Sequence, residues 1–124
     1  MKPKKQISQA EWEVLNILWE KPNATAKEVC AALSATKDWN SKTVGTFLTR
    51  LVDKGVVTVR TDGAAYRYRA RESREKGIIR ESASFLQRVF RGAAGPMLAH
   101  FCEQTKLTPL EIAKLEEILR RKKG

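Results

Sequence analysis

The chain has 124 residues, of which 42% are hydrophobic and 31% are charged, a balance that excludes a disordered chain. Lys and Arg outnumber Asp and Glu by 24 to 14, and the formal net charge of +10 points to a polyanionic partner. No apolar run is long enough to span a bilayer, and the basic residues 1–5 lead into no apolar segment. We therefore expect neither membrane binding nor a secretory signal, and a cytoplasmic protein.

Two capping boxes predict the first two helices. In each, a Ser or Thr is followed three residues later by Glu, at Ser8 with Glu11 and at Thr25 with Glu28. The apolar side chains that recur at helical spacing behind them are expected to be buried. These are Trp12, Leu15, Leu18 and Trp19 in the first helix, and Val29, Ala32 and Leu33 in the second.

A third helix is predicted over residues 41–54, with Gly55 as the glycine that ends it. One face carries an unbroken apolar stripe, made of Val44, Phe47, Leu48, Leu51 and Val52. The opposite face is polar and basic, and consists of Lys42, Thr46, Thr49 and Asp53, flanked by Thr43 and Arg50. One face therefore suits a core, and the other suits a polar partner.

A hairpin follows the third helix. Residues 56–60 and 65–69 read as strands, and Asp62-Gly63 between them is a strong signal for a tight turn. Tyr66 and Tyr68 fall on one strand face and are expected to pack the hairpin against the three helices. Three helices and a hairpin in this order predict a winged helix-turn-helix, with the hairpin as its wing.

Residues 71–124 carry a second pattern. Helices are expected over residues 73–91 and 97–103, separated by a break at 92–96, and a last helix follows the capping box of Thr108 and Glu111. Three short helices in 54 residues cannot bury this much apolar surface by themselves. We therefore expect residues 71–124 to pack against the same residues of a second copy. The expected dimerisation residues are Ile79, Leu86, Phe90, Leu98, Phe101, Ile112, Leu115 and Leu119.

The predicted architecture is mainly α with a small β-hairpin wing. A winged-helix DNA-binding domain, called the head below, is expected over residues 1–70, and a helical dimerisation domain, called the arm, over residues 71–124. Each half has a net charge of +5, because each carries 12 basic and 7 acidic residues. Charge alone therefore does not indicate which half binds nucleic acid. The arrangement of polar and apolar residues on the predicted elements has to be used instead.

The third helix is the candidate reading element, because the major groove of B-DNA admits an α-helix. Its outward N-terminal half supplies the expected base contacts, Lys42, Thr43 and Thr46. Thr49 and Arg50 are better placed for phosphates, and the wing arginines Arg60, Arg67 and Arg69 for phosphates or the minor groove. The competing interpretation is a solvated helix face, and for the wing, charges that keep edge strands soluble.

Few residues suggest any other chemistry. Cys30 and Cys102 belong to no closely spaced pair, so no metal site is expected, and they are interpreted as reduced buried thiols. His100 is the sole histidine and has no neighbouring nucleophile or carboxylate pair. The sequence therefore predicts a protein that is not an enzyme and carries no cofactor.

Several of these segments resemble the penicillinase repressor (BlaI/MecI) family. The resemblance covers nearly the whole chain and rests on Ile7–Leu15, Asp38–Thr46, Thr49–Leu51, Lys54-Gly55, Tyr66–Tyr68, Ser84–Leu86 and Phe90–Gly92. It implies a homodimeric repressor of a dyad-symmetric operator. It further implies control of β-lactam-response genes, and release when a membrane sensor peptidase triggers cleavage of the arm.

Three positions depart from the family pattern. Gly45 stands where better-known members carry a longer polar side chain, which suggests a different operator. The bond matching the family's Asn-Phe cleavage site is His100-Phe101, so it is either a regulated cleavage bond or simply part of a helix at the arm interface. Cys102 is the one cysteine in the C-terminal half, which argues against the cysteine-cluster copper sensing of one branch.

Two other functions stay open. The first is repression of another stress operon, controlled by a ligand or by redox chemistry at Cys102. The second is a basic interaction module that binds DNA without sequence preference, or binds RNA or protein. The operator, the target genes and the inducing signal do not follow from the sequence.

Overall fold

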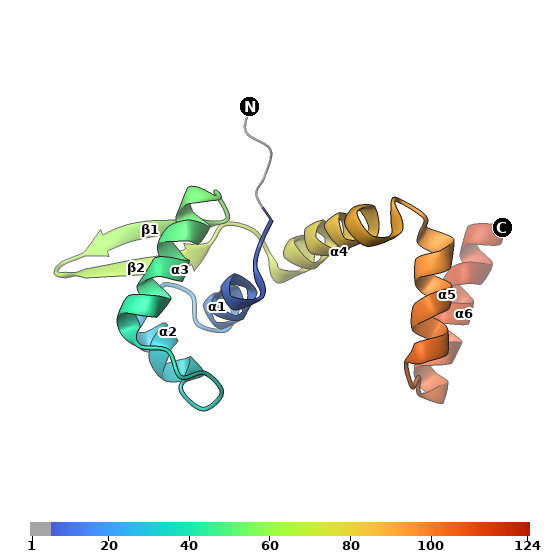
Figure 1. Cartoon of the computed structure of the whole chain (residues 1–124), viewed down its shortest axis with the longest axis horizontal. Coiled ribbons are helices and arrows are strands. Elements are labelled where there is room, and N and C mark those ends of the chain that lie inside the picture. Colours follow the sequence, from blue (N-terminus) through green and yellow to red (C-terminus); the bar gives the residue numbers. More distant parts are fainter. Residues whose placement is uncertain (1–5) are drawn as a thin grey trace. The chain divides into compact units, whose positions relative to one another are not determined.

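The computed structural model describes residues 6–124, which form six helices and one two-stranded antiparallel sheet (Figure 1). The basic residues 1–5, where no secretory signal is expected, lie outside the described residues. The elements are α1 (Gln9–Glu20), α2 (Ala26–Leu33), α3 (Ser41–Asp53), β1 (Val57–Asp62), β2 (Ala65–Ala70), α4 (Arg74–Phe90), α5 (Ala94–Gln104) and α6 (Pro109–Lys123). The predicted class, mainly α with a hairpin wing, is confirmed.

All three predicted capping boxes form. In each, the Glu N–H donates a hydrogen bond to the N-cap hydroxyl, and the Glu carboxylate accepts one from the N-cap N–H. The pairs are Ser8 with Glu11, Thr25 with Glu28 and Thr108 with Glu111. These local bonds satisfy donors that a helix start leaves free, so α1, α2 and α6 begin where the sequence predicts.

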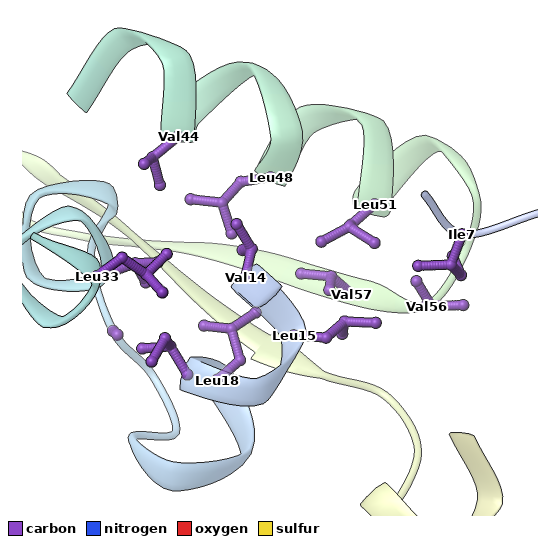
Figure 2. Packing of buried hydrophobic residues seen from close by; sticks show 13 residues of the cluster. Ile7, Val14, Leu15, Leu18, Leu33, Val44, Leu48, Leu51, Val56 and Val57 are labelled. Atoms are coloured by element: carbon purple, nitrogen blue, oxygen red, sulfur yellow. The ribbon is translucent and has the colours of Figure 1, made fainter. Parts of the chain in front are cut away.

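The core of the head lies where α1, α2 and α3 meet the hairpin (Figure 2). Leu48 and Leu51 of α3 face Val14 and Leu15 of α1, and each of these side chains is at most 1% exposed. Val57 at the start of β1 closes the same cluster, at 2% exposed. The apolar stripe of α3 is therefore held against the head along its length.

The wing is anchored to the head as well as to itself. Its strands pair from Val57 with Ala70 to Asp62 with Ala65, so they run slightly longer than predicted. The N–H of Tyr68 also donates to the carbonyl oxygen of Ala24 at 2.9 Å, which adds a short bridge from the loop before α2. This bridge fixes the base of the wing beside the helix-turn-helix.

The residues divide into two compact units, which meet inside α4 between Ser82 and Ala83. The first turns of α4 belong to the head, because Gly77 is buried against the indole of Trp19. Trp12 and Trp19, expected to be buried in the core, are half-buried on this flank of α1. The domain boundary predicted after residue 70 lies before this contact, and it stays a prediction about which part folds alone.

The second unit, Ala83–Gly124, holds the end of α4 with α5 and α6. The predicted break at residues 92–96 is too long, since α5 begins at Ala94. Pro96 fits the first turn of α5, where a missing N–H costs no hydrogen bond, and the chain turns at Arg91 and Gly92, which have φ of 53° and 86°. None of the helices in the described residues is long and apolar enough to cross a membrane.

Candidate DNA interface

The start of α3 is fixed by Trp39 and Asn40 just before it and by Cys30 of α2. The Asn40 side chain caps the helix by accepting a hydrogen bond from the N–H of Thr43 at 2.8 Å. The ring of Trp39 packs on Phe47, with centroids 4.9 Å apart, and the thiol of Cys30 donates to the Trp39 carbonyl oxygen at 3.2 Å. The turn between α2 and α3 is therefore held on both sides.

The two faces of α3 separate as predicted. Val44, Leu48 and Leu51 are fully buried, while Phe47 and Val52 are half-buried beside them. The predicted DNA contacts Lys42, Thr46, Thr49 and Arg50 are exposed, and Thr43 is half-buried.

Thr46 is oriented by its own helix. Its hydroxyl donates to the carbonyl oxygen of Lys42 at 3.1 Å, one turn earlier. That bond uses the hydroxyl proton, so the Thr46 oxygen keeps its capacity to accept from a partner. The side chain is exposed and held in one orientation, which suits a contact with a base edge.

A buried ion pair fastens the other end of α3 to α1. The Lys54 ammonium lies 2.5 Å from a carboxylate oxygen of Glu11 and 2.8 Å from the carbonyl oxygen of Gln6. Glu11 is only 2% exposed, and burial by itself raises the pKa of its carboxyl. Hydrogen bonds from Lys54 and from Ser8 outweigh that effect, so the Glu11 pKa falls below 4.5.

The two faces of the wing carry different chemistry. Cross-strand partners share a face, so the pairing of Arg60 with Arg67 places the arginines on one face, and Arg69 lies there too. Tyr66 and Tyr68 lie on the opposite face. Arg60 and Arg69 are exposed, as a phosphate contact requires.

Arg67 differs from the other two wing arginines. Its guanidinium pairs with Asp62 at 3.0 Å and with Glu28 of α2 at 3.5 Å, and it donates to the carbonyl oxygen of Asn23 at 3.1 Å. The side chain is 34% exposed. Two carboxylates therefore already balance this charge, and the contacts tie the wing to α2.

Both tyrosines were predicted to pack on the head, but only Tyr68 does so. Tyr68 is half-buried and its pKa is raised, first by burial and then by Tyr66 beside it, whereas Tyr66 is 62% exposed. An open groove between α3 and the wing is lined by Thr49, Val52, Val59, Tyr66 and Tyr68. No local pattern along the chain indicates this groove, because it depends on how the wing lies against α3.

The predicted dimerisation residues remain accessible. Among residues 83–124, all of which the structure describes, none is buried. Leu86 and Phe90 are half-buried, and the rest range from 37% exposed at Leu115 to 67% at Ile79. Phe85, Phe90 and Phe101 form an aromatic cluster with ring centroids 5.9 to 6.4 Å apart. These helices expose an apolar surface that a folded chain normally covers.

Comparison with known proteins identifies the family. The model of the penicillinase repressor family matches residues 7–121. The chain is 35% identical to the penicillinase repressor of Bacillus licheniformis, over 100% of this chain and 97% of that one. It is 33% identical to the methicillin resistance regulatory protein MecI of Staphylococcus aureus, over 94% of this chain and 95% of that one. The chain belongs to the penicillinase repressor family.

Solved structures agree with this assignment. The DNA-binding domain of the repressor BlaI is 35% identical and superposes with a TM-score of 0.52, over 60% of this chain and 90% of that one. Apo MarR from E. coli has a TM-score of 0.53 over 93% of this chain and 76% of its own, and at 20% identity it shows the fold alone. The penicillinase repressor family consists of DNA-binding transcriptional repressors, so the prediction that this chain is not an enzyme is confirmed.

The candidate cleavage bond of this penicillinase repressor family member lies in the middle of α5. His100 and Phe101 are both exposed, and the His100 ring lies 6.3 Å from that of Phe90. Cys102 next to them is an exposed free thiol, so the predicted burial is wrong for this cysteine, and Cys30 is half-buried. Within residues 6–124, no three potential metal ligands come together.

Proposed function

We propose that this penicillinase repressor family member acts in the cytoplasm as a homodimer that blocks transcription from a dyad-symmetric operator. The observation that carries the proposal is the division of α3 into a buried apolar face and an exposed polar, basic face. A reading helix needs both, because one face must be rigidly held while the other enters the major groove.

The outward residues of α3 take separate roles in this proposal. Lys42, Thr43 and Thr46, near the start of the helix, contact base edges, as the first turns of recognition helices do. Thr49 and Arg50 lie further along and bind phosphates, which position the head without reading sequence. The oriented hydroxyl of Thr46 is the strongest candidate for direct readout.

The wing adds phosphate contacts through exposed arginines. Arg60 and Arg69 are free to approach the DNA backbone, while Arg67 contributes less, since Asp62 and Glu28 already balance its charge. A solved relative supports the general arrangement, because BlaI of Bacillus licheniformis has been studied as a monomer in complex with the blaP half-operator. That chain is 35% identical, with a TM-score of 0.50 over 60% of this chain and 92% of its own.

A second copy is the partner we propose for the exposed apolar surface of α4, α5 and α6. The predicted dimerisation residues lie on these helices, and none of residues 83–124 is buried in one copy. Covering such a surface is favourable at roughly 25 cal/mol for each Å² removed from water. A two-fold dimer of this kind presents two heads, which suits a palindromic site.

The proposed targets are β-lactam-response genes, as the names of the penicillinase and methicillin-resistance relatives suggest. Cleavage at His100-Phe101, triggered by a membrane sensor peptidase, would divide α5 and separate the two heads. A second candidate signal is redox chemistry, favoured by the exposed thiol of Cys102 on the same helix. Reduced and oxidised protein should then differ in operator affinity, and Cys102→Ser should abolish the difference.

The test is selection of bound sequences from a random duplex library at about physiological salt. A two-fold symmetric site is the expected result, with half-sites one or more helical turns apart, and sedimentation should show a dimer. Binding that persists without any motif and falls steeply with salt would instead identify a non-specific DNA-binding protein.

A further inference from the structure

We propose that the groove between α3 and the wing holds one sugar-phosphate strand of the operator, and that Tyr66 donates a hydrogen bond to a phosphate there. The inference rests on the proposed function, since α3 must first lie in the major groove. It adds a backbone contact from an uncharged side chain, on the wing face opposite Arg60 and Arg69.

The groove is built within one compact unit of the chain. Residues of α3 and of the wing line it, and all of them belong to the unit Met1–Ser82: Thr49, Val52, Val59, Tyr66 and Tyr68. Val59 is the cross-strand partner of Tyr68, and Tyr66, two residues earlier, shares that strand face. The hydrogen bond from the Tyr68 N–H to the Ala24 carbonyl oxygen, at 2.9 Å, attaches this part of the wing to the head.

The place of the groove matches the path of a DNA strand. In duplex DNA, a sugar-phosphate strand separates the major groove from the neighbouring minor groove. When α3 lies in the major groove, a hairpin beside that helix faces the bordering strand. The groove lies between these two elements, and Thr49, the proposed phosphate contact of α3, lines it. The groove is therefore continuous with the proposed DNA interface.

Tyr66 offers a strand both an apolar surface and a hydrogen-bond donor. Its side chain is 62% exposed and that of Val59 is 41% exposed, so deoxyribose carbons can pack on both. Within residues 6–124, no hydrogen bond of the Tyr66 hydroxyl is found, so this group is available to an outside acceptor. A phenolic hydroxyl donates to a phosphate oxygen without carrying a charge.

The charges along this side of α3 favour an anion. Lys42 lies two turns before Thr49 on the same side of the helix, Asp53 lies one turn after it, and both are exposed. The Lys42 ammonium and the positive end of the helix dipole attract phosphate at the start of α3, whereas the Asp53 carboxylate repels it at the end. A strand that enters the groove is therefore attracted toward the N-terminal half of α3.

The size of the groove argues against a small-molecule pocket. It holds about 260 Å³ and is open to solvent. Pockets that enclose drug-sized ligands usually hold roughly 300–1,000 Å³ and bury most of the ligand surface. A backbone strand, by contrast, passes across a protein surface and needs no enclosure. The dimensions therefore favour a strand over a small ligand.

The experiment replaces Tyr66 by Phe in the full chain, which removes the hydroxyl and keeps the ring. We expect affinity to fall about tenfold for a duplex with one selected half-site and for a scrambled duplex alike, because a phosphate contact reads no sequence. The salt slope should stay parental, since no charge is lost. Thr58→Val is the matched control, because it removes a hydroxyl from the opposite wing face, beside Arg69, and its affinity should stay parental.

A set of half-site duplexes then locates the contact. In each duplex, one phosphate is replaced by a neutral methylphosphonate. At the phosphate that Tyr66 binds, this replacement should weaken the parent about tenfold more than it weakens Tyr66→Phe, because the variant has already lost the contact. At the other phosphates, the two proteins should lose affinity equally.

Parental affinity in Tyr66→Phe, a loss confined to the selected half-site, or equal losses for the two proteins at every phosphate would each overturn this inference. A parent that selects no dyad-symmetric site would overturn the proposed function instead. Binding of the scrambled duplex would still test the groove in that case, since the contact with a phosphate does not depend on sequence.

Discussion

Glu11 does two things at the centre of the head. Its carboxylate completes the capping box of α1 by accepting from the N–H of Ser8, and it also pairs with Lys54 just after α3. A charged group that is 2% exposed is tolerated only because both partners are present. This ion pair therefore adds a polar contact to the apolar packing that holds α3 against α1.

Removing Lys54 should be costly at neutral pH. Lys54→Met leaves the Glu11 carboxylate buried and unpaired, so the free energy of unfolding should fall by about 3 kcal/mol. In the parent, the lowered pKa of Glu11 gives stability that is present above pH 4.5 and is lost as the pH falls through the folded-state pKa. In Lys54→Met the pKa should rise, so the deficit should shrink in acid.

Denaturant unfolding at about pH 7 and about pH 4 measures this prediction. Lys37→Met is the control, because Lys37 and Glu13 form a longer pair at 3.9 Å whose side chains are 33% and 29% exposed, worth under about 1 kcal/mol. An equal deficit for Lys54→Met at both pH values would mean that the loss comes from packing rather than charge.

Two glycines near α3 should respond to the same substitution in opposite directions. Nothing lies within 4 Å of a Cβ at Gly45 or at Gly55, so neither alanine meets a clash. Gly45 lies inside α3, where alanine should stabilise the protein by about 1 kcal/mol. Gly55 has φ +81°, so alanine there should destabilise by roughly 1 kcal/mol. Thermal unfolding of both variants tests this, and a shift in the same direction would contradict it.

The exposed face of α3 should affect sequence-specific DNA binding more than non-specific DNA binding. Thr46→Ala removes the exposed hydroxyl that we propose contacts a base edge, so specific affinity should fall by about 1–3 kcal/mol. Non-specific affinity should stay nearly constant, because phosphate contacts carry it. Titrations with the selected site and with a scrambled duplex measure the two. Equal losses would remove Thr46 from the base-reading residues.

The wing predicts a difference among its three arginines. Arg60→Ala and Arg69→Ala should each weaken specific and non-specific binding together and reduce the salt slope by about 1, as expected for one lost phosphate contact. Arg67→Ala should change the salt slope less and lower stability more, because its partners are Asp62 and Glu28 within the head. Salt titrations of DNA binding measure the first effect, and thermal unfolding measures the second. If Arg67→Ala lowered the salt slope by a full unit, Arg67 would have to be counted among the phosphate-binding residues.

At the scale of the whole molecule, the point of truncation matters. A fragment ending at Ser82 keeps Gly77 against Trp12 and Trp19, whereas one ending at residue 70 exposes both indoles. We expect the longer fragment to unfold at the higher temperature, and both to bind a half-site while losing the tight binding of the full operator. Equal melting temperatures would show that the first turns of α4 add nothing to the head.

Features that depend on neighbours along the chain could be predicted from the sequence alone. Three capping boxes fix helix starts within a few residues, and the apolar periodicity of α3 decides which of its faces is buried. The order of helices and hairpin then indicates the winged fold, because few arrangements bury those stripes. The residues of α3 outside this apolar stripe form its polar face. The candidate DNA-binding residues of α3 are therefore identified by the periodicity of the sequence alone.

Contacts between residues far apart in sequence could not be predicted and are seen only in the folded structure. Lys54 meets Glu11 across 43 positions and Trp19 meets Glu72 across 53, and no local pattern announces either contact. From the sequence, Arg67 cannot be distinguished from the other wing arginines, Arg60 and Arg69. In the folded protein, however, Arg67 is the one of the three for which ion pairs are found, with Glu28 and Asp62. The physical reason is that local hydrogen bonds and periodicity act within a few residues, whereas ion pairs and close backbone contacts exist only once the core has brought the elements together.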